Sequence, residues 1–171
     1  MSLISIRKAS QADAHDIAII QTSSWYATYR GLVCDNFLDN FTATSRIAPW
    51  QQILGESDSV FIAVEDNQAI GFAHYSATRD ADSNSNTTAE LTSIYIHPEH
   101  YRKGVGSLLI NAVENALKGE DFSAVTLWAL KGNDGAHQFY LHAGFEPDGS
   151  ESYLERIKAT AIRYQKRIQN R

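Results

Sequence analysis

The sequence predicts a mixed α/β domain with a twisted, mostly antiparallel central sheet, flanking helices and one parallel β-α-β crossover. Three observations lead to this prediction. From residue 60 onward, apolar side chains recur with a period of two, which is typical of strands. Residues 105–117 repeat instead with the period of a helix, and strand-like segments lie on both sides of them, at 90–96 and 122–130. A strand, helix and strand in one sheet almost always form a right-handed parallel crossover.

The chain is long enough for one domain and apolar enough to fill a core. It has 171 residues, of which 43% are hydrophobic and 20% charged, so we expect a single domain over residues 1–171 and no global disorder. The formal net charge is −5 and no dense stripe of Lys and Arg occurs, which argues against a nucleic-acid partner. Because no apolar run reaches about 18 residues, we expect no membrane partner.

The chain contains one cysteine, Cys34. One thiol cannot form a disulfide framework or a cysteine-based metal site, and we expect no metal cofactor. The N-terminus lacks the apolar segment of an export signal. A reducing compartment fits this composition, so we predict a cytoplasmic location.

Basic side chains gather near the C-terminus. Residues 154–171 hold six Lys and Arg against Glu155 alone, whereas residues 1–153 hold nine basic and 19 acidic side chains. We interpret the C-terminal segment as the solvated face of a strand. An edge that steers anions is the alternative.

The first third of the chain predicts a strand followed by helices. Residues 4–7 alternate like a short strand, and Ser10 precedes Asp13 by three residues, as in a capping box that begins a helix. That helix ends near Gly31. The next segment, up to Leu54, predicts one or two short helical pieces interrupted at Pro49.

The middle of the chain predicts a hairpin, a loop and a third strand. Residues 60–64 and 69–75 alternate around a polar turn and predict antiparallel strands. The polar stretch 79–88 is rich in Asp, Asn and Ser, so we expect a mobile loop that cannot bury itself. The strand at 90–96 ends at Pro98.

The last part of the chain contains the clearest helix and the closing strands. Apolar positions of that helix recur on one face: Val105, Leu108, Leu109, Ala112, Val113, Ala116 and Leu117. Residues 122–130 are apolar on both faces, as expected of a covered strand. A shorter helix follows at 133–142 and stops at Gly144, and the segments around Phe145 and at 157–168 predict the final strands.

A glycine-containing turn joins the strand at 90–96 to the clearest helix. It reads Tyr-Arg-Lys-Gly-Val-Gly-Ser over residues 101–107. Free N–H groups at a helix N-terminus bind anions, and glycines let a phosphate approach the backbone. The nucleotide P-loop pattern fails because Leu108 follows Ser107, and the dinucleotide pattern fails because Leu109 replaces the third glycine. The turn therefore predicts a different phosphate ligand.

At this turn the sequence resembles the GNAT superfamily of acetyl-coenzyme A dependent N-acetyltransferases. That family places Q/R-x-x-G-x-G/A between a strand and a helix, and both glycines are present here, while Tyr101 replaces the family's Gln or Arg. The family's second segment, N-x-x-A-x-x-F-Y-x-x-x-G-F, is present in full as Asn133, Ala136, Phe139, Tyr140, Gly144 and Phe145. The order of strands and helices also matches over essentially the whole chain.

The resemblance implies that acetyl-coenzyme A is the co-substrate. The turn's backbone amides would bind the pyrophosphate, and the strand backbone would pair with the pantetheine arm like an added strand. A β-bulge that splays this strand is expected from the family, although the sequence does not show it. The residues implied in coenzyme binding are Ile94, Tyr95, Ile96, Arg102, Lys103, Gly104, Val105, Gly106, Ser107, Asn133 and Tyr140. For Asn133, an N-cap of the following helix is the alternative role.

The resemblance also implies catalytic roles. Tyr140 matches the tyrosine that gives a proton to the departing thiolate, although a core aromatic is the alternative. Glu90 is the first candidate for the base that takes the amine's proton, and a salt-bridging glutamate is its alternative. His74 is the second candidate, against a structural histidine. Some family members use only a chain of water molecules.

The acceptor site is expected near the end of the first long helix, where Trp25 and Tyr29 lie, with His74 as a further substrate contact. Aromatic rings suit a cationic or ring-bearing amine, although packing is the alternative role. We therefore predict a small-molecule or peptide amine as the second substrate. A coenzyme A binding module without turnover is the competing hypothesis, and a homodimer remains open.

Overall fold

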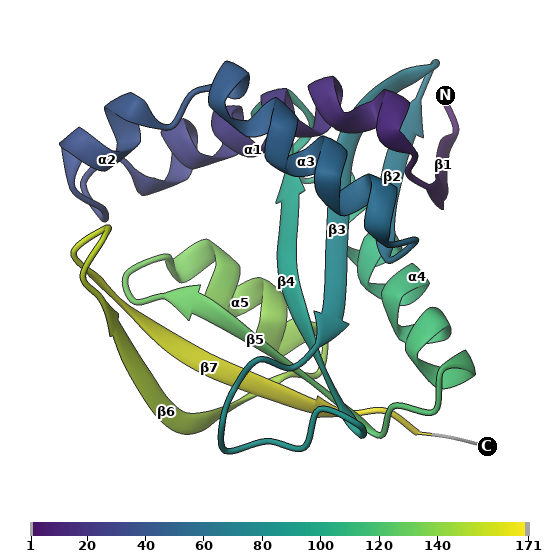
Figure 1. Ribbon diagram of the computed structural model, residues 1–171, viewed down its shortest axis with the longest axis vertical. Coiled ribbons are helices and arrows are strands. Elements are labelled where there is room, and N and C mark those ends of the chain that lie inside the picture. The colour runs from purple at the N-terminus through teal and green to yellow at the C-terminus, as the bar shows by residue number, and fades with distance from the viewer. Residues whose placement is uncertain (1, 170–171) are drawn as a thin grey trace.

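The computed structural model describes residues 2–169, which form a seven-stranded sheet with helices on both faces (Figure 1). The strand order is β1-β2-β3-β4-β5-β7-β6. The strands are β1 (Ile4–Lys8), β2 (Val60–Glu65), β3 (Gln68–Ala77), β4 (Thr88–Ile96), β5 (Ala124–Leu130), β6 (Glu146–Leu154) and β7 (Ala159–Arg167). The helices are α1 (Ala14–Tyr29), α2 (Asp35–Asn40), α3 (Ala43–Glu56), α4 (Val105–Gly119) and α5 (Asp134–His142), with short 3-10 turns η1 (Gln11–Asp13) and η2 (Pro98–His100).

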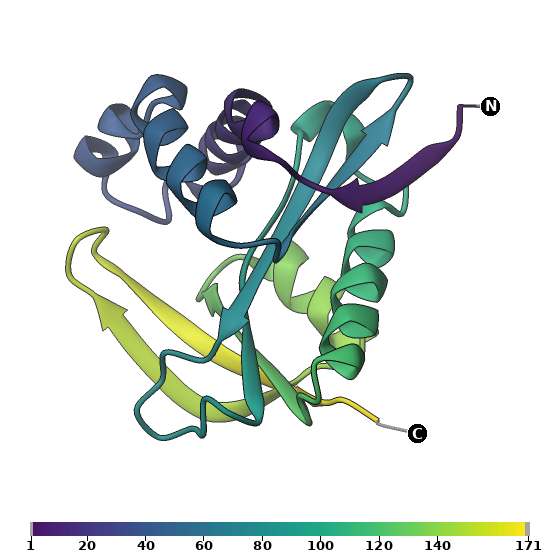
Figure 2. The same ribbon diagram turned by 45° about the vertical axis from the view of Figure 1, so that its right-hand side comes forward.

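The sheet is mixed and mostly antiparallel, which confirms the predicted fold class. Its parallel pair is β4 with β5, joined through α4. This pair is short, since its register runs only from Thr88 opposite Ala124 to Glu90 opposite Thr126. Beyond these residues the two strands diverge, and the sheet opens into two arms, β1–β4 and β5–β7 (Figures 1 and 2).

Each face of the sheet is covered by its own helices. Helices α1 and α3 pack on one face of β2 and β3 around Ile17, Trp50 and Phe72. Helix α4 packs on the opposite face with Leu109 and Leu117 fully buried, and this core continues to the side chains of α5. Figure 2 shows the two helix layers on opposite sides of the strands. Among the helices formed by residues 2–169, none is long and apolar enough to cross a membrane.

The helical period predicts α4 well, with one exception. Val105, Leu109, Val113 and Leu117 are all buried, as expected of positions four residues apart. Leu108 is 40% exposed, so its assignment to the apolar face is wrong. Ile110 is buried in its place, so the buried face is turned about the helix axis relative to the sequence pattern.

The predicted break at Pro49 is also wrong. Helix α3 runs through Pro49, and the chain instead breaks just before the helix, where the Thr42 hydroxyl accepts a hydrogen bond from the Ser45 amide. Proline removes one helical hydrogen bond and usually disrupts a helix. Here Trp50 and Leu54 are buried against the sheet, and we attribute the continuity of the helix to this packing.

The hairpin of β6 and β7 reaches across the open end of the sheet to the segment after α1. The Cys34 amide donates a hydrogen bond to the Ile157 carbonyl at 3.0 Å. Around this bond, Val33, Leu38 and Ile157 belong to a third apolar cluster. The hairpin tip and α2 are therefore held together, although they belong to opposite arms (Figure 1).

The polar loop between β3 and β4 is anchored by Arg163 of β7. The Arg163 guanidinium donates hydrogen bonds to Asp82 at 2.7 Å, to Asp80 at 3.2 Å and to Asp148 at 2.6 Å, and its pairing with Asp82 lowers the pKa of that carboxyl. Arg163 is itself buried. The loop is therefore tied to β7 by these ion pairs, and the expectation that Arg163 belongs to a solvated face is wrong.

We predict that Arg163→Ala lowers the free energy of unfolding by about 3 kcal/mol, because it leaves three carboxylates without their cation. Urea unfolding measures this change. Arg167→Ala is the matched control, since Arg167 is exposed on the same strand, and it should change stability by less than about 0.5 kcal/mol. Equal effects of the two substitutions would contradict the anchoring role of Arg163.

Candidate active site

A cavity of about 550 Å³ lies where β4 separates from β5. Its walls include residues 91–96 of β4, Trp128 and Ala129 of β5, and residues from α1, α5 and the turn before α4. Beyond Glu90 no strand within residues 2–169 pairs with the β5-facing edge of β4. Backbone N–H and C=O groups on such an edge need partners, so the cavity can bind an extended ligand along this strand.

A β-bulge accompanies the separation. The register between β3 and β4 shifts between His74 and Tyr75, which face Ser93 and Leu91, so Thr92 is the extra residue. The Thr92 hydroxyl lies 2.9 Å from the His74 carbonyl oxygen and 2.7 Å from His74 Nδ1. Bulges bend a strand and increase its twist. The bulge expected from the family is therefore present two residues after the last parallel pair.

The turn before α4 and the first turn of that helix each depend on a glycine. Gly104 has φ +79° and a Cβ there would meet nothing within 4 Å, so a side chain would project into open space beside the helix N-terminus. A Cβ on Gly106 would lie 2.8 Å from the Phe139 ring, which means that α4 can approach α5 only with glycine here. Both residues line the cavity.

The two basic residues of the turn, Arg102 and Lys103, point to different places. Arg102 lines the cavity, together with Val105 and Ser107. Lys103 does not line it, and its ammonium lies 3.2 Å from a Glu65 carboxylate oxygen. The structure therefore brings Arg102 to the cavity and directs Lys103 to β2.

Tyr101 contacts helix α1, which the sequence analysis did not anticipate. Its hydroxyl lies 3.4 Å from the Ser24 hydroxyl and 3.5 Å from that of Thr28, and all three residues line the cavity. The i, i+4 spacing of Ser24 and Thr28 on one helix face was the available signal. These contacts connect the turn to α1 at the residue that departs from the family pattern.

Asn133 and Tyr140 enter the cavity from α5. The Asn133 side chain caps this helix by accepting a hydrogen bond from the Ala136 amide at 3.4 Å. Tyr140 is 9% exposed, and burial, with a smaller effect of Tyr95, raises the pKa of its phenol. The Tyr140 hydroxyl has no hydrogen-bond partner among the described residues. It is thus a protonated donor at neutral pH that faces the cavity.

An aromatic cluster borders the cavity on the side of α1. Tyr29 and Tyr95 line the cavity, and burial is the main cause that raises the pKa of both phenols. Trp25 lies behind them, with its ring centroid 4.7 Å from Tyr29 and 6.5 Å from Tyr95. Trp25 itself belongs to the third apolar cluster and is not part of the cavity wall.

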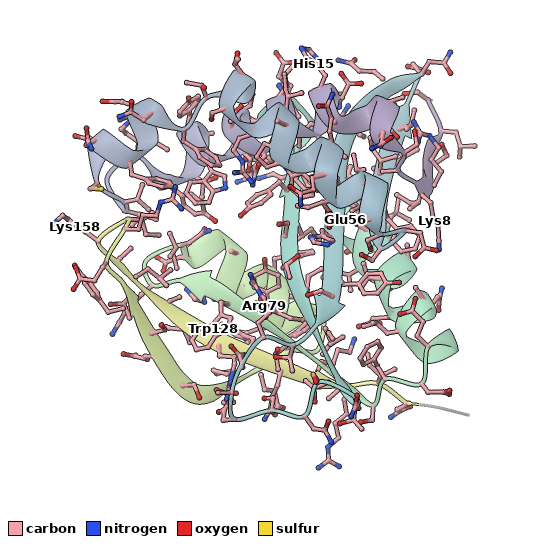
Figure 3. All side chains as sticks on the ribbon, in the orientation of Figure 1. Lys8, His15, Glu56, Arg79, Trp128 and Lys158 are labelled. Atoms are coloured by element: carbon pink, nitrogen blue, oxygen red, sulfur yellow. The ribbon has the colours of Figure 1, made fainter. Side chains whose placement is uncertain are left out.

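Glu90 and His74 lie near the cavity but not in its wall. The Glu90 carboxylate is buried and accepts a hydrogen bond from Arg79 Nη2 at 2.7 Å. The His74 ring packs on Trp50 of α3, and burial lowers its pKa to about 4, with Arg79 adding to this effect and Glu90 opposing it. In the view of Figure 3, Arg79 and Trp128 project in front of the sheet, on the side that α3 also covers.

One cavity thus contains the freed edge of β4, open space beside the N-terminus of α4 and a buried phenol. The model of the acetyltransferase (GNAT) family matches residues 23–145, and the chain belongs to this family. It is an acetyl-coenzyme A dependent acyltransferase.

Curated relatives carry related names. The chain is 25% identical over 163 residues to the uncharacterized N-acetyltransferase YuaI of Bacillus subtilis, covering 94% of this chain and 92% of that protein. It is also 25% identical over 164 residues to spermidine N(1)-acetyltransferase of Thermoplasma acidophilum, covering 90% of this chain and 96% of the relative.

Solved structures share the fold. The PaiA N-acetyltransferase of Thermoplasma acidophilum, in complex with coenzyme A, superposes with a TM-score of 0.73 at 21% identity, over 94% of this chain and 98% of that one. YncA of Salmonella typhimurium, described as a putative acetyltransferase with its cofactor acetyl-CoA, gives a TM-score of 0.75 at 19% identity, over 99% and 96% of the two chains.

We predict that His74 contributes to the loss of stability in mild acid. Its pKa is about 4 in the folded protein and near 6.5 when unfolded. As the pH falls from about 6.5 to 4, the unfolded chain binds a proton that the folded chain does not, so the free energy of unfolding decreases by up to about 1.4 kcal/mol per pH unit. His74→Gln should flatten this slope in urea titrations.

His15→Gln is the control for the acid stability experiment, because the His15 side chain is 67% exposed. This variant should keep the slope of the wild type between pH 6.5 and 4. The interpretation of His74 is contradicted if His74→Gln and the wild type lose stability in parallel over that range.

Proposed function

We propose that the protein transfers the acetyl group of acetyl-coenzyme A to a primary amine of a small molecule or peptide by direct attack in a ternary complex. The observation that carries this proposal is the cavity between the diverging strands β4 and β5, which holds the free edge of β4 and Tyr140 together. Family membership supports the transferase activity. The proposal adds the class of acceptor, the direct attack within a ternary complex, and the residues that bind the coenzyme and transfer protons.

The residues of the cavity fit coenzyme A in two places. Along residues 94–96, the unpaired edge of β4 offers backbone groups to the amides of a pantetheine arm, as in β-strand addition. At the other place, Gly104 leaves open space beside the N-terminus of α4, where amides and the helix dipole favour a pyrophosphate. Arg102 adds positive charge to that end of the cavity, and Ser107 and Asn133 add polar contacts.

Bound acetyl-coenzyme A supplies an acetyl group activated as a thioester. The amine's lone pair forms the new C–N bond as the C–S bond breaks, and the sulfur leaves with the bonding pair. Tyr140 donates its phenolic proton to that sulfur, and the phenolate regains a proton from solvent. The amine loses one proton to a base, so the products are an N-acetyl amine and a free thiol.

Glu90 and His74 remain the two predicted candidates for the base that takes the amine's proton. A pKa of about 4 makes the imidazole of His74 a weak proton acceptor at neutral pH. The Glu90 carboxylate is paired with Arg79 and lies outside the cavity wall. We therefore propose that the amine's proton reaches Glu90 through water molecules.

Thiol release tests the proposed function. The protein is mixed with acetyl-coenzyme A and a broad panel of primary amines, and free thiol is followed in time. The proposal expects release that depends on the amine and an acetylated amine of matching yield. Coenzyme A binding without amine-dependent thiol release across the panel would support the binding module without turnover.

We predict that Tyr140→Phe lowers kcat about 100-fold, because it removes the proton donor and keeps the ring. The KM for acetyl-coenzyme A should stay close to the wild-type value, which separates chemistry from binding. Steady-state thiol release measures both. Tyr153→Phe is the control, since Tyr153 is 56% exposed on β6, and a Tyr140→Phe variant as fast as this control would exclude Tyr140 as the acid.

We predict that Gly104→Glu raises the Kd for coenzyme A about 100-fold, because bulk and negative charge would occupy the space proposed for the pyrophosphate. Calorimetric titration with coenzyme A measures the change. Gly149→Glu is a matched control, since Gly149 also has a positive φ, +88°, and open space at its Cβ. If both variants bind coenzyme A equally well, the pyrophosphate does not lie at Gly104.

A further inference from the structure

We infer that the acceptor carries an anionic group, such as a carboxylate, in addition to the amine that is acetylated, and that Arg46 and Arg156 bind this group. The inference rests on the proposed function and narrows its substrate class. It follows from the surroundings of two arginines at the aromatic cluster beside the cavity.

Most arginines on this side of the molecule already have a carboxylate partner. Arg30 is paired with Asp35 and Asp39, Arg79 with Glu90, and Arg163 with three aspartates. In the part of the chain that the structure describes, the arginines without a carboxylate within 4 Å are Arg46, Arg102, Arg156 and Arg167. Arg102 lies in the turn before α4, which is proposed to bind the coenzyme, and Arg167 lies at the exposed end of β7. Arg46 and Arg156 therefore remain without an anionic partner or an assigned role.

Arg46 is held in position without being neutralised. It lies on α3, is partly buried, and donates a hydrogen bond from Nε to Gln21 Oε1 at 3.1 Å. The same oxygen accepts a hydrogen bond from Trp50 at 2.8 Å, so Gln21 is fixed between the two. The guanidinium lies 5.4 Å from the centre of the Phe41 ring. Its terminal N–H groups have no acceptor among residues 2–169 and remain available to a ligand.

Arg156 approaches the same place from the opposite arm of the sheet. It lies in the turn between β6 and β7, with its guanidinium 5.3 Å from the centre of the Phe37 ring. The Phe37 and Phe41 rings stack with centroids 5.6 Å apart. The two cations therefore lie over neighbouring rings, and in Figure 3 the hairpin tip that carries Lys158 lies directly beneath α2.

The two arginines disfavour each other. Burial lowers the pKa of Arg46, and the positive charge of Arg156 lowers it further. A partly buried cation without a counterion is costly, and a second cation nearby adds to this cost. An anion bound between them would remove both penalties and could accept the planar pairs of N–H groups that guanidinium presents to carboxylates.

This place adjoins the cavity through the packed aromatic cluster, although neither arginine lines the cavity itself. The Trp25 ring lies 4.5 Å from Phe41 and 6.5 Å from Tyr95, centroid to centroid, and Tyr95 belongs to the cavity wall. An acceptor with its amine near the thioester and its carboxylate near Arg46 would therefore extend across Tyr95. A polyamine is disfavoured, because the outer rings that could bind a cation already carry the protein's own guanidinium groups.

The test compares amines that differ only in charge. A series of α-amino acids and ω-aminoalkanoates is assayed by thiol release, each beside its own carboxamide, together with uncharged alkylamines and spermidine. The wild type should use the best carboxylate at least about tenfold more efficiently, in kcat/KM, than its carboxamide. Arg46→Gln and Arg156→Gln should each remove about tenfold of this preference, mainly through KM.

Controls separate recognition from folding. Arg167→Gln, which removes an exposed arginine without a carboxylate partner, should keep the wild-type preference. Arg46→Lys should recover part of the preference that Arg46→Gln loses. The melting temperature of Arg46→Gln should equal or exceed that of the wild type, because an unneutralised charge is lost.

Two results overturn the inference and differ in what they say of the proposed function. If the wild type acetylates spermidine or the carboxamides as well as the carboxylates, or if the two glutamine variants lose activity equally on all amines, the anion site is wrong and the transferase function stands. If no amine in any series releases thiol while coenzyme A still binds, the proposed function fails and the inference fails with it.

Discussion

The early separation of β4 from β5 is the constraint on which the rest of the structure depends. Parallel pairing stops at Glu90 and Thr126, so one edge of β4 gives up hydrogen bonds that a continuous sheet would make. Such unpaired backbone groups are costly unless a ligand or water satisfies them. The bulge at Thr92 bends β4 where the pairing ends, and the turn, α5 and α1 then surround the freed edge.

The two arms of the sheet share a core on one face and separate on the other. Helices α1 and α3 bury the side chains of β2 and β3 on one face, and on the other face α4 and α5 bury side chains from both arms. Across the open side the arms meet at a limited contact, where the Cys34 amide reaches the hairpin tip at Ile157. A small contact of this kind closes one side of the site and leaves the strand edge accessible.

The sequence predicted those features of the structure that depend on residues close together along the chain. The period of α4 and the cap at Asn133 follow from nearby residues and agree with the structure. Contacts between distant residues were not predictable in this way: Arg163 and Asp80 are 83 positions apart. The partners of Tyr101 and Lys103 likewise lie far away in the sequence, on α1 and β2. The periodicity of one sequence shows which face of an element is buried but not which other element it contacts.

The two motif segments that appear separately in the sequence form one physical unit in the structure. Gly106 leaves room for the Phe139 ring at a distance where any Cβ would clash, so the first segment needs glycine because of an aromatic residue in the second. The next residue, Tyr140, is placed by the same approach of α4 to α5, and the ring of Phe145 packs against it with centroids 6.0 Å apart. This helix contact therefore sets the spacing between the turn proposed to bind the coenzyme phosphates and the phenol proposed to protonate its sulfur. Substitution of Gly106 would alter both ends of the site together, although Gly106 itself has no side chain to offer a ligand.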